Sequence, residues 1–335
     1  GVGGTGVVAT LRRGTSNRCI ALRAEMDALR ITEQTNLPYA SRNTGTMHAC
    51  GHDGHTTMLL GAARRLVAEG DFDGTVRFVF QPAEEWGKGA LAMLADGLMD
   101  RFPFEEIYGL HNLPGVPVGT MQARPGAMMS AEDNFVIKLR GKGGHAARPH
   151  WGRETLVAGA ALVMQLQTIV SRRINPTDTA VVSVTEFNTD GIRNALPGLT
   201  VLKGDARSFS PEVSTRLEAE MRMIAAGTAL TYDVDVEVDY THEFLPLMND
   251  RELVEEAMEA GRGVFGEDGV RLAEAPQTSS EDFAQLLSKV PGCFSFIGNG
   301  EKSFPLHNSS YDFNDDVLPY GANYHVAIAR RRLPV

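Results

Sequence analysis

Strand-like and helix-like segments alternate through the first third of this 335-residue chain, and their order is the feature that most restricts the fold. Short apolar runs bounded by turn residues predict strands, whereas apolar residues that recur every three or four positions predict helices. The predicted strands cover residues 5–11, 18–26, 74–82, 105–112 and 118–124, and the predicted helices cover 54–70 and 89–99. Strands that alternate with helices favour a mostly parallel sheet covered by helices on both faces.

The pattern changes between residues 128 and 240. Long helices are predicted at 153–173 and 211–230, and strands of alternating apolar and polar residues at 134–141, 179–187, 199–209 and 232–240. This combination predicts an α+β two-layer domain, with helices on one face of an antiparallel sheet. The earlier pattern then returns, with helices at 250–265, 279–289 and 321–331 and a strand at 293–299. We therefore predict one α/β domain, residues 1–127 and 241–335, interrupted by a domain inserted at 128–240.

Charge and cysteine content restrict the partners and the compartment. Lys and Arg number 32 against 42 Asp and Glu, so the formal net charge of −10 disfavours nucleic acid and anionic membranes as partners. We find no apolar run near the ~20 residues that span a bilayer, and expect no membrane partner. Three widely spaced cysteines do not form a disulfide framework, which favours the reducing cytoplasm. The chain begins at Gly1 rather than Met, so we expect a missing amino-terminal segment.

Polar side chains follow several of the predicted strands. In parallel α/β sheets, ligands bind beyond the carboxyl ends of the strands. We therefore expect these side chains to converge on one rim of the sheet. The residues concerned are Asp27, Cys50, His52, Glu84, Glu85, His111 and His307.

Thiol, imidazole and carboxylate groups together suit zinc or a similar transition metal better than calcium or magnesium. Two ions roughly 3.5 Å apart would stabilise both an attacking water and a developing oxyanion. The spacing of Cys50 and His52 lets both side chains reach neighbouring metal positions. Of the adjacent Glu84 and Glu85, one can bind metal while the other takes a proton from water.

Other interpretations of the same residues remain open at this point. Cys50 could instead be a nucleophile that a distant histidine activates, because neighbours two positions apart rarely pair. His48 is either a polar loop residue or a partner of a metal ligand, and we prefer a hydrogen-bonded structural role for His55. Asp282 either borders the pocket or caps the helix predicted at 279–289.

Six motifs go further than these local patterns. They are "ALRAEMDAL", "NLPYASRNTGTMHACGHDGH", "VRFVFQPAEE", "GLHNLPGVPVGT", "GKGGHAARPH" and "LHNSSYDFND". Together they resemble the di-metal aminoacylase branch of the zinc-peptidase superfamily, which includes hippurate hydrolases, N-acyl-amino-acid amidohydrolases and auxin-conjugate hydrolases. The motifs span nearly the whole chain in consistent order. The resemblance implies a catalytic α/β domain with an inserted lid and dimerisation domain.

The resemblance also implies roles for individual residues of the α/β domain. Glu84 matches the general base, and Asp27 matches a carboxylate that orients a metal-bound His52. Glu25 stands where the family usually has Asp, and we do not include it among the ligands. The two metals would be bound by Cys50, which bridges them, and by His52, Glu85, His111 and His307.

In the inserted domain, the resemblance implies three substrate contacts. His145 would reach the active site across a dimer and contact the substrate amide and its oxyanion. Asn194 and Arg207 would hold the free carboxylate of the substrate, a task that suits the planar guanidinium of arginine.

The resemblance finally implies an activity. Glu84 would activate a metal-bound water to hydrolyse the amide of an N-acyl amino acid, such as a hippurate-like compound, into a carboxylic acid and a free amino acid. Two divalent ions are implied, zinc first, with manganese, cobalt or nickel as alternatives, in a cytoplasmic homodimer formed through the insert. A dipeptidase or an N-carbamoyl-amino-acid hydrolase is the nearest alternative activity. A cysteine-nucleophile hydrolase and a non-catalytic binding protein are the alternatives from other classes.

Overall fold

The computed structural model describes all of residues 1–335 and divides the chain into two compact units. The first unit is formed by Gly1–Met128, Leu247–Pro276 and Glu281–Val335, and the second by Met129–Pro246 and Gln277–Ser280. From the sequence we predicted that 241–246 and 277–280 belong to the α/β domain, whereas the structure places both segments in the second unit. The strand Asp235–Phe244 pairs with Ala131–Arg140 of this unit, and the backbone N–H of Ser130 donates to the carbonyls of Gln277 and Ser279.

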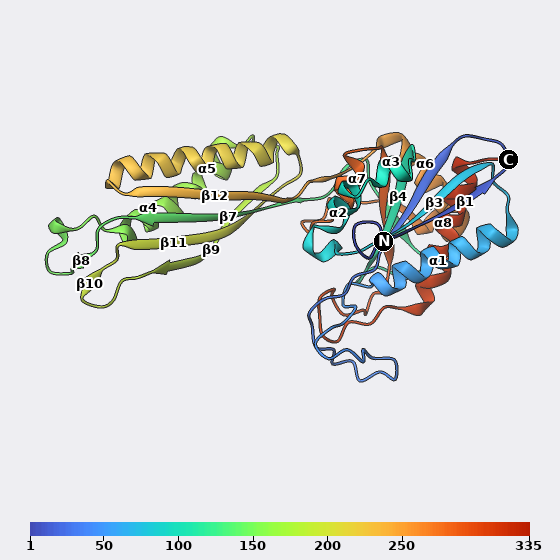
Figure 1. The fold of residues 1–335 in the computed structure, drawn as a ribbon, viewed down its shortest axis with the longest axis horizontal. Coiled ribbons are helices and arrows are strands. Elements are labelled where there is room, and N and C mark those ends of the chain that lie inside the picture. Colours follow the sequence, from blue (N-terminus) through green and yellow to red (C-terminus); the bar gives the residue numbers. More distant parts are fainter. The chain divides into compact units, whose positions relative to one another are not determined.

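The first unit is built on a seven-stranded sheet in the order β1-β3-β2-β4-β15-β5-β14 (Figure 1). The pairs β3–β2, β2–β4, β4–β15 and β5–β14 are parallel, whereas β1–β3 and β15–β5 are antiparallel. The predicted mostly parallel sheet is therefore confirmed. Its strands are β1 (Val7–Arg13), β2 (Cys19–Glu25), β3 (Gly74–Gln81), β4 (Glu106–Leu113), β5 (Met121–Ala123), β14 (Val270–Leu272) and β15 (Gly292–Gly298).

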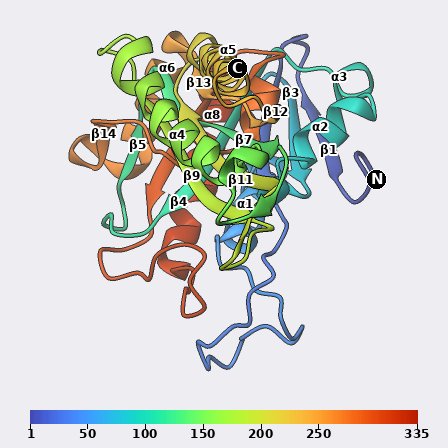
Figure 2. The same ribbon diagram turned by 90° about the vertical axis from the view of Figure 1, so that its left-hand side faces the viewer.

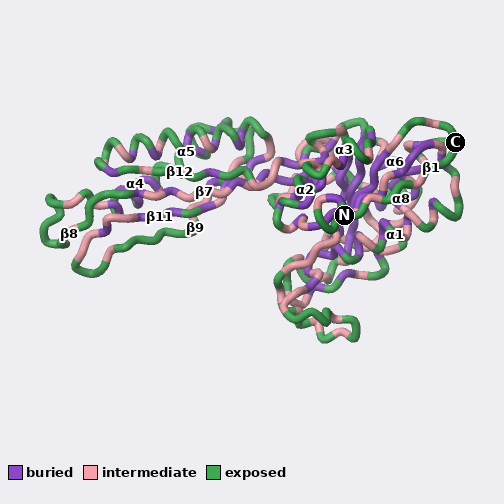
Figure 3. The backbone as a smooth tube through the Cα atoms, viewed as in Figure 1, coloured by how far each residue is buried: buried purple, intermediate pink, exposed green.

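Helices cover both faces of this sheet. Along β4, Tyr108 and Leu110 point into one apolar cluster with residues of α1, α6 and α8. A Cβ added to the intervening Gly109 would instead lie 3.2 Å from Phe283 of α7, on the opposite face. Figure 3 shows the buried strands at the centre of the unit. The helices are α1 (His52–Glu69), α2 (Gly89–Ala95), α3 (Leu98–Arg101), α6 (Arg251–Phe265), α7 (Phe283–Leu287) and α8 (Leu318–Arg332).

The second unit is a two-layer α+β structure. Its antiparallel sheet has the order β12-β7-β11-β9, and α4 and α5 pack against each other on one face (Figures 1 and 2). Phe135, Ile137 and Leu139 of β7 alternate toward the helices and are buried with Leu162 and Leu217. The elements are β7 (Ala131–Arg140), β8 (Gly144–His145), α4 (Thr155–Thr168), β9 (Ala180–Thr189), β10 (Ala195–Leu196), β11 (Leu199–Ser208), α5 (Pro211–Tyr232) and β12 (Asp235–Phe244). Separately, β6 (Gly126–Met129) pairs with β13 (Leu247–Asn249).

Two predicted helices differ from the structure. The segment predicted at 89–99 is divided into α2 and α3, because Gly97 adopts a φ of 77°. The helix predicted at 279–289 is reduced to α7, because Glu281 and Asp282 turn into the protein interior instead of starting the helix.

One apolar segment is longer than the sequence analysis expected. The helical segment Thr155–Arg173 is long and apolar enough, by length and composition alone, to cross a membrane, which corrects the expectation that the chain has no such run. Ala158, Leu162 and Leu166 from this segment are fully buried in the core of the second unit. These apolar residues form the face of the helix that packs on the sheet, so they belong to a folded core.

Helix α8 buries a histidine that has no hydrogen-bond partner. His325 is fully buried, and neither of its ring nitrogens has a partner. Burial lowers the pKa of His325 from 6.5 to about 4, although the charge of Glu25 opposes this shift. The neutral imidazole is therefore the form that the folded chain accommodates.

We predict that His325→Leu makes the fold less sensitive to acid. Because the pKa of His325 is lower in the folded chain, the unfolded chain binds the proton first as the pH falls, and stability present above pH 6.5 is lost toward pH 4. Between pH 7 and pH 5, the free energy of unfolding should fall by about 2 kcal/mol more in the wild type than in the variant, measured by denaturant titration. Ile328→Leu is the control and should follow the wild type; equal losses in wild type and His325→Leu would contradict this account.

Candidate catalytic metal centre

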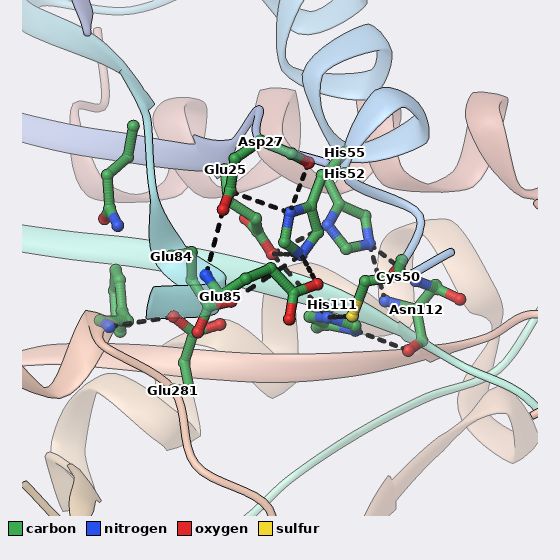
Figure 4. Close-up of polar contacts among 12 residues, drawn as sticks. Glu25, Asp27, Cys50, His52, His55, Glu84, Glu85, His111, Asn112 and Glu281 are labelled. Atoms are coloured by element: carbon green, nitrogen blue, oxygen red, sulfur yellow. Dashed lines mark hydrogen bonds and ion pairs between the residues drawn. The ribbon is translucent and has the colours of Figure 1, made fainter. Parts of the chain in front are cut away.

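The side chains of Cys50 and His52 lie in one cluster (Figure 4), and Gly51 between them adopts the left-handed backbone conformation. Gly51 has a φ of 89°, and an added Cβ would lie 2.4 Å from the side-chain nitrogen of Asn112. Only glycine fits this conformation and this close approach without strain. Helix α1 begins at His52, so Cys50 lies just ahead of its first turn.

Glu84 and Glu85 lie on a single turn of 3₁₀ helix, Glu84–Trp86, directly after β3. Ala83 before this turn and Gly87 after it both have positive φ, 51° and 61°. The backbone N–H of Glu85 donates to Asp27 Oδ2 at 3.1 Å. The turn therefore presents two adjacent carboxylates beside the loop that carries Asp27.

His111 and His307 enter the cluster from β4 and from a loop. His111 donates from Nδ1 to the carbonyl of Asn112 at 2.7 Å, which leaves Nε2 as a lone pair 3.4 Å from Cys50 Sγ. The backbone N–H of His307 donates to the carbonyl of Ala49, and His307 Nε2 lies 3.3 Å from Glu85 Oε2.

His52 is oriented by Asp27. Its Nδ1 lies 3.1 Å from both the Oδ1 and the backbone carbonyl of Asp27, so Nδ1 carries the proton that is donated. Burial lowers the pKa of His52, but the hydrogen bond with Asp27 and the charges of Glu25 and Glu85 outweigh burial and raise the pKa to about 9. The ring therefore binds a second proton readily; when that proton is lost, Nε2 becomes an inward-facing lone pair, because Nδ1 remains the donor to Asp27.

The ligand atoms fit a divalent metal ion. His52 Nε2 and Glu85 Oε1 are both buried without a hydrogen-bond partner, and they lie 4.0 Å apart. Cys50, His52 and Glu85 each offer an atom within 4.8 Å of the others. Buried polar atoms without a partner are rare, and a bound cation would satisfy both of these. Sulfur, imidazole nitrogen and carboxylate oxygen suit a zinc-like ion.

His55 lies in the same cluster but is already hydrogen-bonded. Its Nδ1 is 2.9 Å from Glu25 Oε1, and its Nε2 accepts from the backbone N–H of Asn112 at 3.0 Å. Both ring nitrogens are hydrogen-bonded, which agrees with the structural role that we preferred for His55.

The sequence did not reveal that four residues beside the proposed ligands form a buried ionic network. Arg23 is fully buried in β2 and pairs with Glu25, Glu281 and Asp282. Asp282 does not cap α7; the side chain of Glu281 accepts from the N–H of Phe283 instead. A single arginine within the apolar strand "CIALRAE" was the available sequence signal.

The environment of Glu84 follows from these neighbours. The carboxylates of Glu84, Glu281 and Asp282 lie within 4.8 Å of one another. Burial, followed by the charges of Glu281 and Asp282, raises the pKa of Glu84 well above its usual range. A carboxylate in this environment binds a proton more readily than an exposed one.

A cysteine nucleophile is disfavoured by the same environment. His111 is close enough to Cys50 to act as its base. However, burial and then the charges of Glu85, Glu84 and Glu25 raise the pKa of Cys50 well above its usual range, and burial lowers the pKa of His111. A reactive thiolate requires the opposite shifts.

In the second unit, His145 and Asn194 lie close together at the two-stranded antiparallel sheet of β8 and β10, where His145 pairs with Ala195. The N–H of Ala146 donates to the carbonyl of Asn194. His145 is exposed and its Nδ1 accepts from the N–H of Ala147 at 3.1 Å, so its Nε2 carries the proton. This small sheet therefore presents an exposed N–H donor.

The structure does not bring Asn194 and Arg207 together within one chain. Asn194 precedes the start of β11, whereas Arg207 is near its end, and the extended strand between Leu199 and Arg207 spans about 26 Å. Arg207 is tied to Glu132 and Asp205, each at 2.9 Å, and to Ser280. A shared carboxylate contact would therefore need two subunits.

Comparison with known proteins supports this geometry. The sequence matches Peptidase family M20/M25/M40 over residues 21–331. It is 38% identical to the hippurate hydrolase of Campylobacter jejuni over 99% of this chain and 86% of that protein. It is 36% identical to an N-acetyl-L-cysteine deacetylase of Bacillus subtilis, over 98% of this chain and 78% of that protein.

A solved structure has the same fold. The crystal structure of a dinuclear metal-binding peptidase of the M20 family from Bacillus subtilis matches with a TM-score of 0.84 and 33% identity, covering 97% of this chain and 84% of that one. The resemblance inferred from the motifs, the fold class and the assignment to the amide-bond hydrolases are confirmed. The chain belongs to Peptidase family M20/M25/M40.

Proposed function

We propose that this chain is a metal-dependent amidohydrolase that cleaves N-acyl amino acids, including hippurate-like compounds, into a carboxylic acid and a free amino acid. The names of the hippurate hydrolase and the deacetylase that it resembles support this substrate class. The observation that carries the proposal is the buried pair of unpartnered atoms, His52 Nε2 and Glu85 Oε1, with Glu84 beside them.

Two divalent ions would be held by this cluster. We assign zinc first, because the donor set mixes sulfur, nitrogen and oxygen, with manganese, cobalt or nickel as alternatives. When bound, such ions stabilise developing negative charge and make water more acidic. The residues that would hold them are Cys50, His52, Glu85, His111 and His307.

Glu84 is the proposed general base. Its Oε2 faces His52 Nε2 at 4.0 Å, while its Oε1 accepts from the backbone N–H of Asp282 at 3.3 Å. The carboxylate would take the proton of the attacking water, retain it while the carbon–nitrogen bond breaks, and pass it to the leaving amine. Asp27 keeps His52 in the tautomer whose Nε2 is free.

The second unit would complete the site in a homodimer. Strand β9 is at the end of its sheet, and the exposed Val157 and Met164 give the unit an apolar surface. The protonated Nε2 of His145 would donate to the oxyanion from one subunit. Because Asn194 and Arg207 lie at opposite ends of β11, we assign their carboxylate contacts to different subunits. The three free cysteines are consistent with the cytoplasm as the compartment.

We predict that Glu84→Gln retains the fold and the bound metal but loses catalysis. The amide has nearly the same shape but cannot take a proton, so kcat should fall about 10²–10⁴-fold. Steady-state assays on N-acetyl, N-benzoyl and N-formyl amino acids, with metal content measured in parallel, test this. Near-normal kcat in Glu84→Gln, with loss of activity after thiol alkylation of the wild type, would favour a cysteine nucleophile instead.

A second prediction concerns subunit sharing. His145→Ala and Glu84→Gln should each be nearly inactive, but a mixture that exchanges subunits should recover about a quarter of the wild-type rate, because half of the dimers are mixed and each mixed dimer has one intact site. Light scattering first establishes the oligomeric state, and tagged subunits establish exchange. No recovery despite demonstrated exchange would contradict a shared site.

A further inference from the structure

Arg23 is a charged side chain inside the sheet of the first unit. It lies on β2 and its relative exposure is 0%. The guanidinium donates to Gln81 Oε1 at 2.9 Å and pairs with Glu25 at 2.9 Å, Glu281 at 2.9 Å and Asp282 at 3.1 Å. Apolar residues can often replace buried ion pairs without loss of stability, so stability alone does not account for this cluster.

Asp282 connects Arg23 to the segment that carries Glu84. Asp282 Oδ1 accepts from Arg23 and, at 2.6 Å, from the side-chain amide of Gln81. Its Oδ2 accepts from the backbone N–H of Ala90 at 2.9 Å. Gln81 is the last residue of β3 and Ala90 lies in the first turn of α2, so these bonds fix both ends of the segment between them.

The same turn of chain holds the carboxylate of Glu84. The backbone N–H of Asp282 donates to Glu84 Oε1 at 3.3 Å, and Glu84 Oε2 then faces His52 Nε2. Glu84, Glu281 and Asp282 bring three carboxylates within 4.8 Å of one another. Coulomb repulsion would separate these groups if Arg23 did not bind two of them.

Arg23 also reaches the histidine side of the centre. Glu25, which pairs with Arg23, lies 2.9 Å from His55 Nδ1. His55 in turn accepts from the backbone N–H of Asn112, the residue after His111. One guanidinium therefore contacts both Asp282, which supports the proposed base, and Glu25, which supports His55.

We infer that Arg23, Glu281 and Asp282 form a buried clamp that positions Glu84 for proton transfer. Arg23 is a positioning residue, because it acts on Glu84 through Asp282 and does not contact the reacting atoms. The planar, multiply donating guanidinium is required, since a lysine ammonium cannot bind three carboxylates and an amide in this geometry. The catalytic part of this inference rests on the proposed function of Glu84.

The test compares Arg23→Lys with the wild-type protein. We expect kcat to fall about 10²-fold, because a small displacement of a catalytic group has effects of this size. KM should change by less than about threefold, and the metal content should be unchanged. Hydrogen exchange of the backbone amides in residues 83–90 should become faster, because the clamp no longer fixes this segment.

A double variant separates positioning from a general structural role. If Arg23 acts through Glu84, Arg23→Lys should have almost no further effect on kcat in a Glu84→Gln background. A structural defect would lower kcat in both backgrounds. Arg332→Lys is the matched control, because Arg332 forms a two-point pair with Glu106 at 2.8 Å elsewhere in the first unit and should leave kcat unchanged.

Asp282→Asn gives an independent test if Arg23→Lys does not fold. The asparagine has nearly the same shape, but its amide group points a donor at either the backbone N–H of Ala90 or the side-chain amide of Gln81, so one hydrogen bond is lost. Hydrogen exchange in residues 83–90 should again be faster, and kcat should fall about 10-fold. Unchanged exchange in the folded variants, or additive kcat losses with Glu84→Gln, would overturn the clamp. A wild-type protein inactive on N-acyl amino acids would instead overturn the proposed function, while the exchange result would still decide the clamp.

Discussion

The centre of the first unit depends on buried ligand atoms that the fold leaves without a hydrogen-bond partner. His52 Nε2 and Glu85 Oε1 face each other at 4.0 Å, and neither has a partner. Other atoms of the same two residues are held in place, because Asp27 accepts hydrogen bonds from both His52 Nδ1 and the backbone N–H of Glu85. Desolvating such groups is unfavourable unless something binds them, so the arrangement is that of a site prepared for a cation.

The surrounding sheet supplies the geometry by placing different chemistry on its two faces. Alternate residues of β2 face opposite sides, so Ile20, Leu22 and Ala24 join the apolar cluster while Arg23 and Glu25 form the ionic network. Arg23 then pairs with Asp282, which is 259 residues away in the sequence. The segment carrying Glu84 is thus held from one side by Asp27 and from the other by Asp282.

The sequence predicted the fold class and the residues at the strand ends, because both depend on local periodicity and on the general geometry of parallel sheets. It did not reveal the ionic network, because a single Arg23 in an apolar strand does not specify partners from distant segments. The short α7 has the same cause: Glu281 and Asp282 follow a helix-like pattern, but tertiary ion pairs draw them inward. The separation of Asn194 from Arg207 could not be predicted from motifs, because a family motif implies a role without stating which subunit supplies it.

Anomalous diffraction from crystals of the zinc-loaded protein, recorded on both sides of the zinc absorption edge, tests the central claim most directly. The account predicts two peaks roughly 3.5 Å apart, with Cys50 between them and His52, Glu85, His111 and His307 around them. Peaks remote from Cys50 and Glu85, or a zinc-saturated protein in which His52 Nε2 has no metal neighbour, would contradict it.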